Sequence, residues 1–388
     1  MARSIYLDYQ SSKPVDPRVI EAMRPWFYEN FGNPSALHYI GDQATTMLEK
    51  SRSQVADSIH AKADEIVFTS GATEANNLAI IGYAMRNKNR GNHIIISEIE
   101  HISIINITKF LEKNGFKISR VPVDHFGMVN IDKIRERITD QTILVSIAYA
   151  SNEVGTIQPI TEIGKLCREK KIVLHSDAVA AVGLLPINVI SDNVDLLSLS
   201  SNDIYGPKGT GALFIKEGLR LIPVIIGGGQ ENGLRSGTEN LPGIAGMAKA
   251  AVIMQTEMEN EVPKLIKFRE KLINKIPRLI PKTYLNGHPT ERLPNNAHFR
   301  FDGIEGEALL LSLKDKNIAV STGSACSSKT LEPSHTLIAM GLLHEEAHGS
   351  LQLTCGRFTV EQDIDTLIDR LPAVVDRLRK LSPLYREA

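Results

Sequence analysis

The chain has 388 residues, of which 42% are hydrophobic and 23% are charged, and its formal net charge is −1. These values are typical of a globular protein with a large core and a second domain, and they exclude a strongly basic nucleic-acid-binding or membrane-surface protein. The cysteines, Cys167, Cys326 and Cys355, lie far apart, which argues against a disulfide framework or a zinc ribbon. Since no apolar run is long enough to span a bilayer and the start of the chain has no apolar signal core, we expect a cytoplasmic protein without a membrane or nucleic-acid partner.

Short β-branched runs alternate with longer helical patterns through the first two thirds of the chain. This alternation predicts an α/β fold with a mostly parallel sheet. The predicted strands cover residues 65–69, 93–97, 117–122, 142–147, 172–175, 194–198 and 211–215. Helices are predicted between them, for example over residues 74–86 and 160–169.

After Thr238 the pattern changes to a long helical stretch that reaches about residue 280. A smaller α/β unit follows. Its predicted strands cover residues 284–286, 297–301 and 350–354, and its predicted helices cover residues 305–314 and 360–381. The sequence therefore predicts a large domain over residues 15–256, and a small domain made of residues 1–14 and 257–388.

The segment from Ser70 to Glu74 (SGATE) lies between a predicted strand and a predicted helix. Small residues there let backbone N–H groups approach a phosphate, and Thr73 offers a hydroxyl donor. Read alone, the segment is better explained as a tight strand-to-helix turn with a capping threonine. It is therefore a weak signal of a phosphate site.

Three further polar residues follow predicted strands. His101 suits acid–base chemistry, although a single histidine is more often structural. Asp177 suits pairing with a protonated ring nitrogen, and is otherwise a cap for the next turn. Asn152 suits a hydrogen bond to a ring hydroxyl, and is otherwise a turn former. Each residue alone leaves both interpretations open.

Taken in their order along the chain, these motifs resemble the cysteine desulfurases of the NifS/IscS family. The resemblance covers almost the whole chain. It is carried by LDY (7–9), GNPS (32–35), SGATEANN (70–77), EH (100–101), SNEVG (151–155), HSDA (175–178), YGPKG (205–209), GGGQE (227–231), RSGTEN (235–240), STGSACS (321–327) and GRFT (356–359).

The resemblance implies a fold type I architecture for pyridoxal phosphate (PLP), with a large domain built on a mostly parallel seven-stranded sheet and a smaller C-terminal α/β domain. It also implies a homodimer in which Thr238 reaches the phosphate of the partner's site, and sulfur mobilisation from L-cysteine. The implied catalytic residues are His101, which stacks on the pyridine ring, and Cys326, which carries the persulfide. The implied cofactor-binding residues are Ala72, Thr73, His101, Asn152, Asp177, Ser200, Ser201, Asn202 and Thr238.

The departures from the family pattern cluster in the implied site. Asp203 stands where the family has the lysine that holds PLP as a Schiff base, and Asn202 replaces the histidine before it. Ala180 replaces a glutamine that contacts the cofactor, and Gln352 replaces the arginine that binds the substrate carboxylate. We therefore expect PLP to be held non-covalently or to be absent, because a carboxylate at 203 weakens binding further unless it is protonated or paired. Lys208 is the nearest alternative amine in the sequence, but it belongs to the turn after the cofactor loop.

The loop around Cys326 keeps the family sequence in full. Its thiolate is either an exposed bystander or a group that carries a persulfide or binds iron. The C-terminal tail, residues 381–386, resembles the segment through which such proteins dock an IscU-type scaffold. Cys167 and Cys355 fit packing positions.

Three functions remain open at this point: a functioning desulfurase that uses another lysine, a subunit for cluster assembly, and a PLP enzyme of other specificity. The sequence favours the second. In that hypothesis Cys326 acts as sulfur acceptor, or as metal ligand to a [2Fe–2S] cluster shared with the scaffold. The main alternative is a PLP-dependent desulfurase that converts L-cysteine to L-alanine and leaves a persulfide on Cys326.

Overall fold

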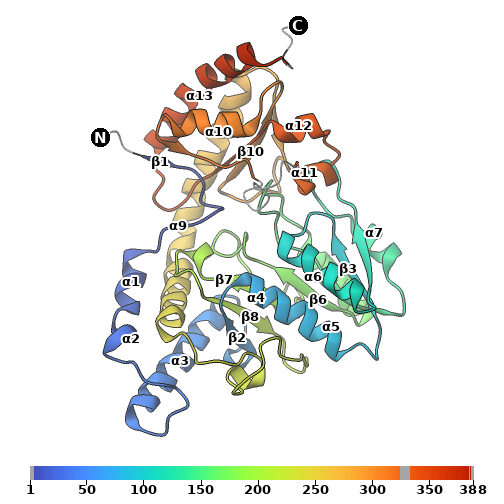
Figure 1. The fold of residues 1–388 in the computed structure, drawn as a ribbon, viewed down its shortest axis with the longest axis vertical. Helices are drawn as coiled ribbons and strands as arrows, with labels where there is room; N and C mark the ends of the chain where they lie inside the picture. The colour runs from blue at the N-terminus through green and yellow to red at the C-terminus, as the bar shows by residue number, and fades with distance from the viewer. Residues whose placement is uncertain (1–3, 324–332, 384, 386–388) are drawn as a thin grey trace.

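A seven-stranded sheet forms the centre of the computed structural model, which describes residues 4–323, 333–383 and 385 (Figure 1). The strand order is β2-β8-β7-β6-β5-β3-β4. The bounds are β2 (Ile66–Thr69), β3 (His93–Ser97), β4 (Lys117–Val121), β5 (Thr142–Ser146), β6 (Val173–Asp177), β7 (Leu196–Ser200) and β8 (Gly211–Ile215). All the strands predicted for the large domain are present, so the predicted α/β class and sheet are confirmed.

The sheet is parallel except for β8, which runs antiparallel to both of its neighbours, β2 and β7. The strands β3 and β5 are buried along their whole length, which explains their continuous apolar sequences. Two predicted strand ends were too early. β6 continues to Asp177 and β7 to Ser200, so both residues lie at the carboxyl edge of the sheet.

Helices cover the two faces of this sheet. On one side lies a continuous helical segment that differs from the single helix predicted over residues 74–86. It consists of α4 (Ala72–Asn77), a π-helical turn η2 (Leu78–Gly82) and α5 (Tyr83–Arg86). The remaining helices and 3₁₀ turns of this part are α6 (Ile102–Lys113), α7 (Ile131–Arg137), α8 (Ile160–Lys170), η1 (Ala63–Glu65), η3 (Asn202–Ile204) and η4 (Glu231–Gly233).

A long helix, α9 (Leu241–Leu279), joins the two parts of the molecule (Figure 1). It packs against α1 (Pro17–Met23) and α3 (Tyr39–Asp57) beside the large sheet, and against α13 (Glu361–Leu381) at the other end. The short α2 (Pro25–Tyr28) lies between α1 and α3 in the chain. Because the predicted boundary at 256/257 falls inside α9, the division into two domains stays a prediction.

The smaller part contains an antiparallel sheet of order β12-β10-β9 and a parallel pair, β1 with β11. The strand bounds are β1 (Ile5–Tyr6), β9 (Thr283–Asn286), β10 (Asn296–Phe301), β11 (Ile318–Ala319) and β12 (Ser350–Thr354). The helix bounds are α10 (Gly306–Lys314), α11 (His335–Ala339), α12 (His344–His348) and α13. Pairing with β11 carries the first residues of the chain past the small sheet and on toward η3.

Within the described ranges of the chain, none of the helices has both the length and the hydropathy needed to cross a membrane.

A buried ion pair fixes the loop that precedes Thr238. The guanidinium of Arg52 donates to both carboxylate oxygens of Glu231, at 2.7 and 2.8 Å, and the backbone N–H of Phe68 donates to the same carboxylate at 2.7 Å. Both side chains are almost fully buried. The pair therefore ties η4 to α3 and β2, since neither charge has water as an alternative partner.

We expect Glu231→Gln to destabilise the protein strongly, because it leaves the Arg52 guanidinium buried without a counter-charge. Removing one member of a buried ion pair costs about 3–5 kcal/mol. The matched control is Glu217→Gln, which breaks the surface pair with Lys62, where both side chains are about two-thirds exposed. Urea unfolding followed by circular dichroism measures both variants. Equal stability of the two variants would contradict a structural role for the Arg52–Glu231 pair.

Candidate active site

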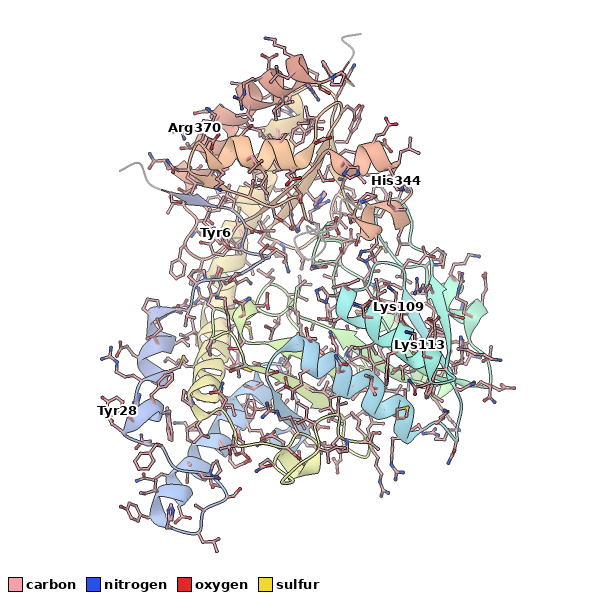
Figure 2. All side chains as sticks on the ribbon, viewed as in Figure 1. Tyr6, Tyr28, Lys109, Lys113, His344 and Arg370 are labelled. Atoms are coloured by element: carbon pink, nitrogen blue, oxygen red, sulfur yellow. The ribbon has the colours of Figure 1, made fainter. Side chains whose placement is uncertain are left out.

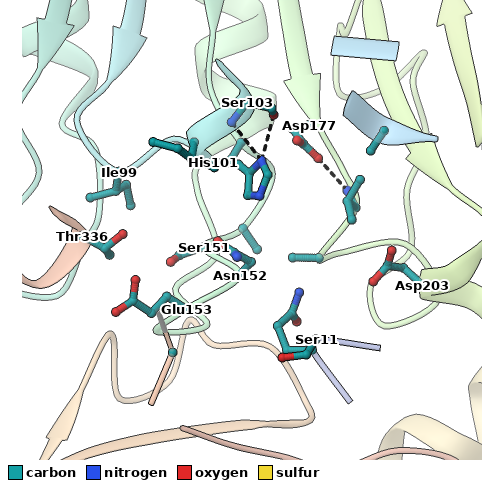
Figure 3. A pocket seen from close by; sticks show the side chains of 18 of the residues that line it. Ser11, Ile99, His101, Ser103, Ser151, Asn152, Glu153, Asp177, Asp203 and Thr336 are labelled. Carbon is teal, nitrogen blue, oxygen red and sulfur yellow. Dashed lines mark hydrogen bonds between the residues drawn. The ribbon is translucent and has the colours of Figure 1, made fainter. Parts of the chain in front are cut away.

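A cavity of about 350 Å³ lies between the carboxyl edge of the large sheet and the smaller part of the chain (Figure 3). This is the size range of small-molecule sites in proteins. The strands β2, β3, β5, β6 and β7 end toward it, so side chains that follow several different strands meet there. The other wall comes from Gln10, Ser11, Ser321, Ser334 and Gln352.

Most of the residues singled out in the sequence line this cavity. They are Ala72, Thr73, His101, Asn152, Asp177 and Asn202 among the expected cofactor-binding residues, and Asp203, Ala180 and Gln352 among the altered family positions. The structure thus brings together segments that are up to about 280 residues apart in the sequence.

Three expected residues are not among the described residues that line the cavity. Ser200 instead lies beside Asp203, where its side chain opposes the rise in the pKa of the Asp203 carboxyl group that burial causes. Ser201 is fully buried, and its Oγ atom faces Gly206, where there is no space for a Cβ atom. Its expected contact with the cofactor therefore stays a prediction. Thr238 is exposed at the surface, as a residue that reaches a partner's site would be. Cys326 lies outside the described residues.

Asp177 is held rigidly at the end of β6. Asn76 donates its side-chain amide to one carboxylate oxygen at 2.8 Å, and the backbone N–H of Val179 donates to the other at 3.0 Å. The second bond shows that Asp177 caps the following turn. The first fixes its carboxylate at the cavity wall, where a protonated ring nitrogen would find a negative partner.

His101 is held by the first turn of α6. Its Nδ1 atom accepts the backbone N–H of Ser103 at 3.2 Å and lies 2.8 Å from the Ser103 hydroxyl (Figure 3). Because Nδ1 acts as the acceptor, the neutral ring carries its proton on Nε2. The ring can therefore exchange a proton with a ligand only through Nε2.

The side-chain amide of Gln352 is used in hydrogen bonds to the backbone. Its Nε2 atom donates to the backbone oxygens of Asn152 and Glu153, both at 2.7 Å. These bonds fix the turn that carries Asn152 and Glu153 into the cavity. The side chain of Gln352 therefore stabilises this wall of the cavity, and it carries no charge to attract a carboxylate.

The cavity is unusually acidic. Its described lining includes the carboxyl groups of Asp177, Asp203 and Glu153, and no lysine or arginine is among the described lining residues. Burial raises the pKa of Glu153 to about 7, although hydrogen bonds from Ser334 and Thr336 oppose the shift. Burial also raises the pKa of Glu100, behind the wall, to about 8. Burial therefore favours the neutral form of Glu153 and Glu100.

A residue that the sequence analysis missed, Lys13, lies directly behind the cavity wall. Its side chain is 6% exposed, and its Nζ atom donates to the backbone oxygen of Asp203 at 2.5 Å. Lys208, the amine considered from the sequence, is exposed at the surface and reaches only the backbone oxygen of Lys13. Nothing in the local sequence of Lys13 predicts its burial, because its partner is 190 residues away in the chain.

The lining residues suit the pyridine ring of PLP but not a covalent bond to its aldehyde. Asp177, His101 and Asn152 suit a planar pyridine ring with a protonated nitrogen. None of the described lining residues supplies a primary amine for a Schiff base to the cofactor. The thiols of Cys167 and Cys355 are buried elsewhere, and burial raises the pKa of each to about 12, as expected of packing residues.

Comparison with known proteins identifies the family. Residues 5–367 match the family model described as aminotransferase class-V. The chain is 52% identical, over 98% of its length and 99% of the relative, to cysteine desulfurase IscS 1 of Archaeoglobus fulgidus, and 48% identical, over 98% and 94%, to cysteine desulfurase IscS of Methanosarcina thermophila.

Solved structures agree with the sequence relatives. A NifS-like protein superposes with a TM-score of 0.91 at 34% identity, covering 97% of this chain and 100% of the other. The NifS-like protein from Rickettsia africae gives 0.88 at 31% identity, covering 96% and 100%. By its motifs, its fold and these relatives, the chain belongs to the IscS/NifS family of cysteine desulfurases, within the class-V aminotransferases.

Proposed function

We propose that the protein is an IscS-like subunit for iron–sulfur cluster assembly in which the usual desulfurase chemistry is impaired. The observation that carries the proposal is the position of Asp203 in the cavity wall, with no lysine among the described lining residues. In the family, this sequence position holds the lysine that binds PLP. A carboxylate forms no Schiff base with the cofactor, so PLP would be held non-covalently or not at all.

The substrate end of the cavity supports the same conclusion. L-cysteine carries a carboxylate, which the family binds through an arginine. Here Gln352 is neutral and already bonded to the backbone of Asn152 and Glu153. An amino-acid carboxylate would also meet the acidic lining, so its binding should be weak.

When bound, PLP would supply an electron sink for bond cleavage next to the amino group of a substrate. The residues of this chain would bind the ring without forming a covalent bond to the cofactor. Asp177 would accept a hydrogen bond from the ring nitrogen, and His101 would cover the ring and exchange a proton through Nε2. Ala72 and Thr73 would lie nearest the phosphate, together with Thr238 of the partner subunit.

The thiol of Cys326 is the group through which we propose that the protein acts. It lies outside the described residues, but described residues on either side of that segment, Gly323 and Ser334, line the cavity. Three thiolates from an IscU-type scaffold plus Cys326 would complete the four that a [2Fe–2S] cluster prefers. Otherwise the Cys326 thiolate would attack the outer sulfur of a donor persulfide and become a persulfide itself, while the donor leaves as a thiolate. A reducing cytoplasm would keep this thiol available.

A functioning desulfurase is the second candidate, and the names of the relatives favour it. The relatives from Archaeoglobus fulgidus and Methanosarcina thermophila are cysteine desulfurases in name, at 52% and 48% identity. In that case L-cysteine would be converted to L-alanine, and its sulfur would remain as a persulfide on Cys326. Alanine released from L-cysteine in the presence of PLP distinguishes the two candidates.

A homodimer is supported by exposed apolar side chains around α2 and the start of α3. Tyr28 points outward from the end of α2 in Figure 2 and is 64% exposed. Four other large side chains near it in the sequence are exposed to a similar or greater extent: Phe27, Phe31, Leu37 and Tyr39. Such a cluster is unfavourable in water and suits burial against a second copy of the chain.

For cluster assembly, we expect Cys326→Ser to lower the yield of [2Fe–2S] cluster in an anaerobic complex with an IscU-type scaffold, iron and sulfide by about tenfold. The reason is that the substitution removes the fourth thiolate. Ser327→Ala, which keeps the thiol, is the matched control. Absorbance and iron content of the purified complex measure the result. An unchanged cluster yield would remove the main support for the assembly function.

For the oligomer, we expect light scattering to give twice the chain mass for the wild type. Tyr28→Asp should shift the protein toward monomer, because it places a charge in the proposed interface. Ile190→Asp, at a similarly exposed apolar residue in a different part of the chain, is the control and should leave the dimer intact. A monomeric wild type would contradict the homodimer.

A further inference from the structure

We infer that Lys13 and Asp203 act as one buried charge pair behind the cavity wall, and that Lys13 makes this chain incompatible with a lysine at position 203. Lys13 is thus a positioning residue for the altered site. The inference rests on the proposed function, in which Asp203 takes the place of the cofactor lysine.

The geometry places the two residues in one desolvated space. Lys13 is 6% exposed and Asp203 is 7% exposed. The ammonium of Lys13 donates to the backbone oxygen of Asp203, and the backbone N–H of Lys13 lies 3.5 Å from the side-chain oxygen of the neighbouring Asn202. The segment after β1 is therefore attached to η3 through Lys13 itself.

The ammonium of Lys13 and the carboxyl group of Asp203 act on each other through space, since the direct contact of the ammonium is with the backbone oxygen of Asp203. Burial lowers the pKa of Lys13, and among the groups that oppose this shift the carboxylate of Asp203 is the strongest. Burial raises the pKa of Asp203, and among the groups that oppose that shift the ammonium of Lys13 is the strongest. Each charge would be costly in this space without the other.

The surrounding charged groups do not replace either partner. The other acid that acts on Lys13, Glu261, is bonded to Arg357 at 2.9 Å, and Arg357 also binds Asp16 at 2.8 Å. Arg357 repels Lys13, and Asp177 repels Asp203. Since Glu261 is already neutralised, Asp203 is the carboxylate that balances Lys13.

A lysine at position 203 would reverse this balance. It would place a second ammonium beside the buried Lys13, with Arg357 nearby and no added carboxylate. The charged form of the new amine would therefore be unfavourable at this position. Removing the charge of Lys13 removes the repulsion.

Thermal unfolding of Lys13→Met, Asp203→Asn and the double variant Lys13→Met/Asp203→Asn tests the pair directly. Each single variant should lower Tm by about 5 °C or more, because it leaves one charge buried alone. The double variant should lose clearly less than the sum of the two single losses, since it removes both charges. Additive losses would overturn the pair.

Restoration of lysine tests the consequence for the site. Asp203→Lys and Lys13→Met/Asp203→Lys are incubated with PLP and reduced with borohydride, and the covalent adduct at residue 203 is measured by intact mass and peptide mapping. We expect about tenfold more adduct in the double variant. Asp203→Lys combined with Lys208→Met, which removes an exposed lysine, should not show this gain. If Asp203→Lys alone is labelled as fully as the double variant, the inference is wrong.

The two sets of variants separate this inference from the proposed function. A PLP adduct on Lys13 of the wild type would overturn the proposed function, whereas the thermal cycle would still report whether the charges are coupled. If Asp203→Lys fails to fold and the double variant folds, the result supports the inference. If neither folds, the thermal unfolding of Lys13→Met, Asp203→Asn and their double variant decides whether the inference holds.

Discussion

The structure depends on how a carboxylate is accommodated at the end of β7. Asp203 is buried at the cavity wall, and a buried charge persists only where an opposite charge or strong hydrogen bonds compensate its lost hydration. Lys13 supplies an opposite charge nearby, and the polar side chains of Ser200 and Asn202 also favour the charged form. The first segment of the chain, η3 and the cavity wall are therefore one electrostatic unit, and a change at position 203 is not an isolated substitution.

The cavity contains side chains that suit a pyridine ring, but no described side chain that suits a covalent bond to the cofactor. Asp177 is fixed by Asn76 and by the turn after β6, and His101 is fixed by the start of α6, so both side chains are held in place at the cavity wall. Under the proposed function, Asp203 and Gln352 stand at the positions that bind the cofactor covalently and the substrate carboxylate in the family. A site that suits a pyridine ring but binds an amino-acid carboxylate weakly is consistent with the proposal that the protein acts through the thiol of Cys326.

The elements that could be predicted from sequence are those set by local patterns. Buried strands such as β3 and β5 have continuous apolar sequences, and the long helix α9 has an apolar pattern of helical period. Most of the residues expected at the site from the family motifs line the cavity. The π-helical turn η2 was missed because one extra residue in a helical turn leaves the apolar pattern nearly unchanged. Lys13 was missed because its burial depends on a contact with backbone 190 residues away, which no local pattern encodes.

The most direct test of this account is the attachment of PLP to the wild-type protein. The protein is saturated with PLP, reduced with borohydride, digested and mapped by mass spectrometry, with a lysine-anchored desulfurase of the same family as the positive control. The account predicts that the control is labelled on its cofactor lysine and that no lysine of this chain is labelled in stoichiometric amount. A stoichiometric PLP adduct on Lys208, or on any other lysine, would contradict it.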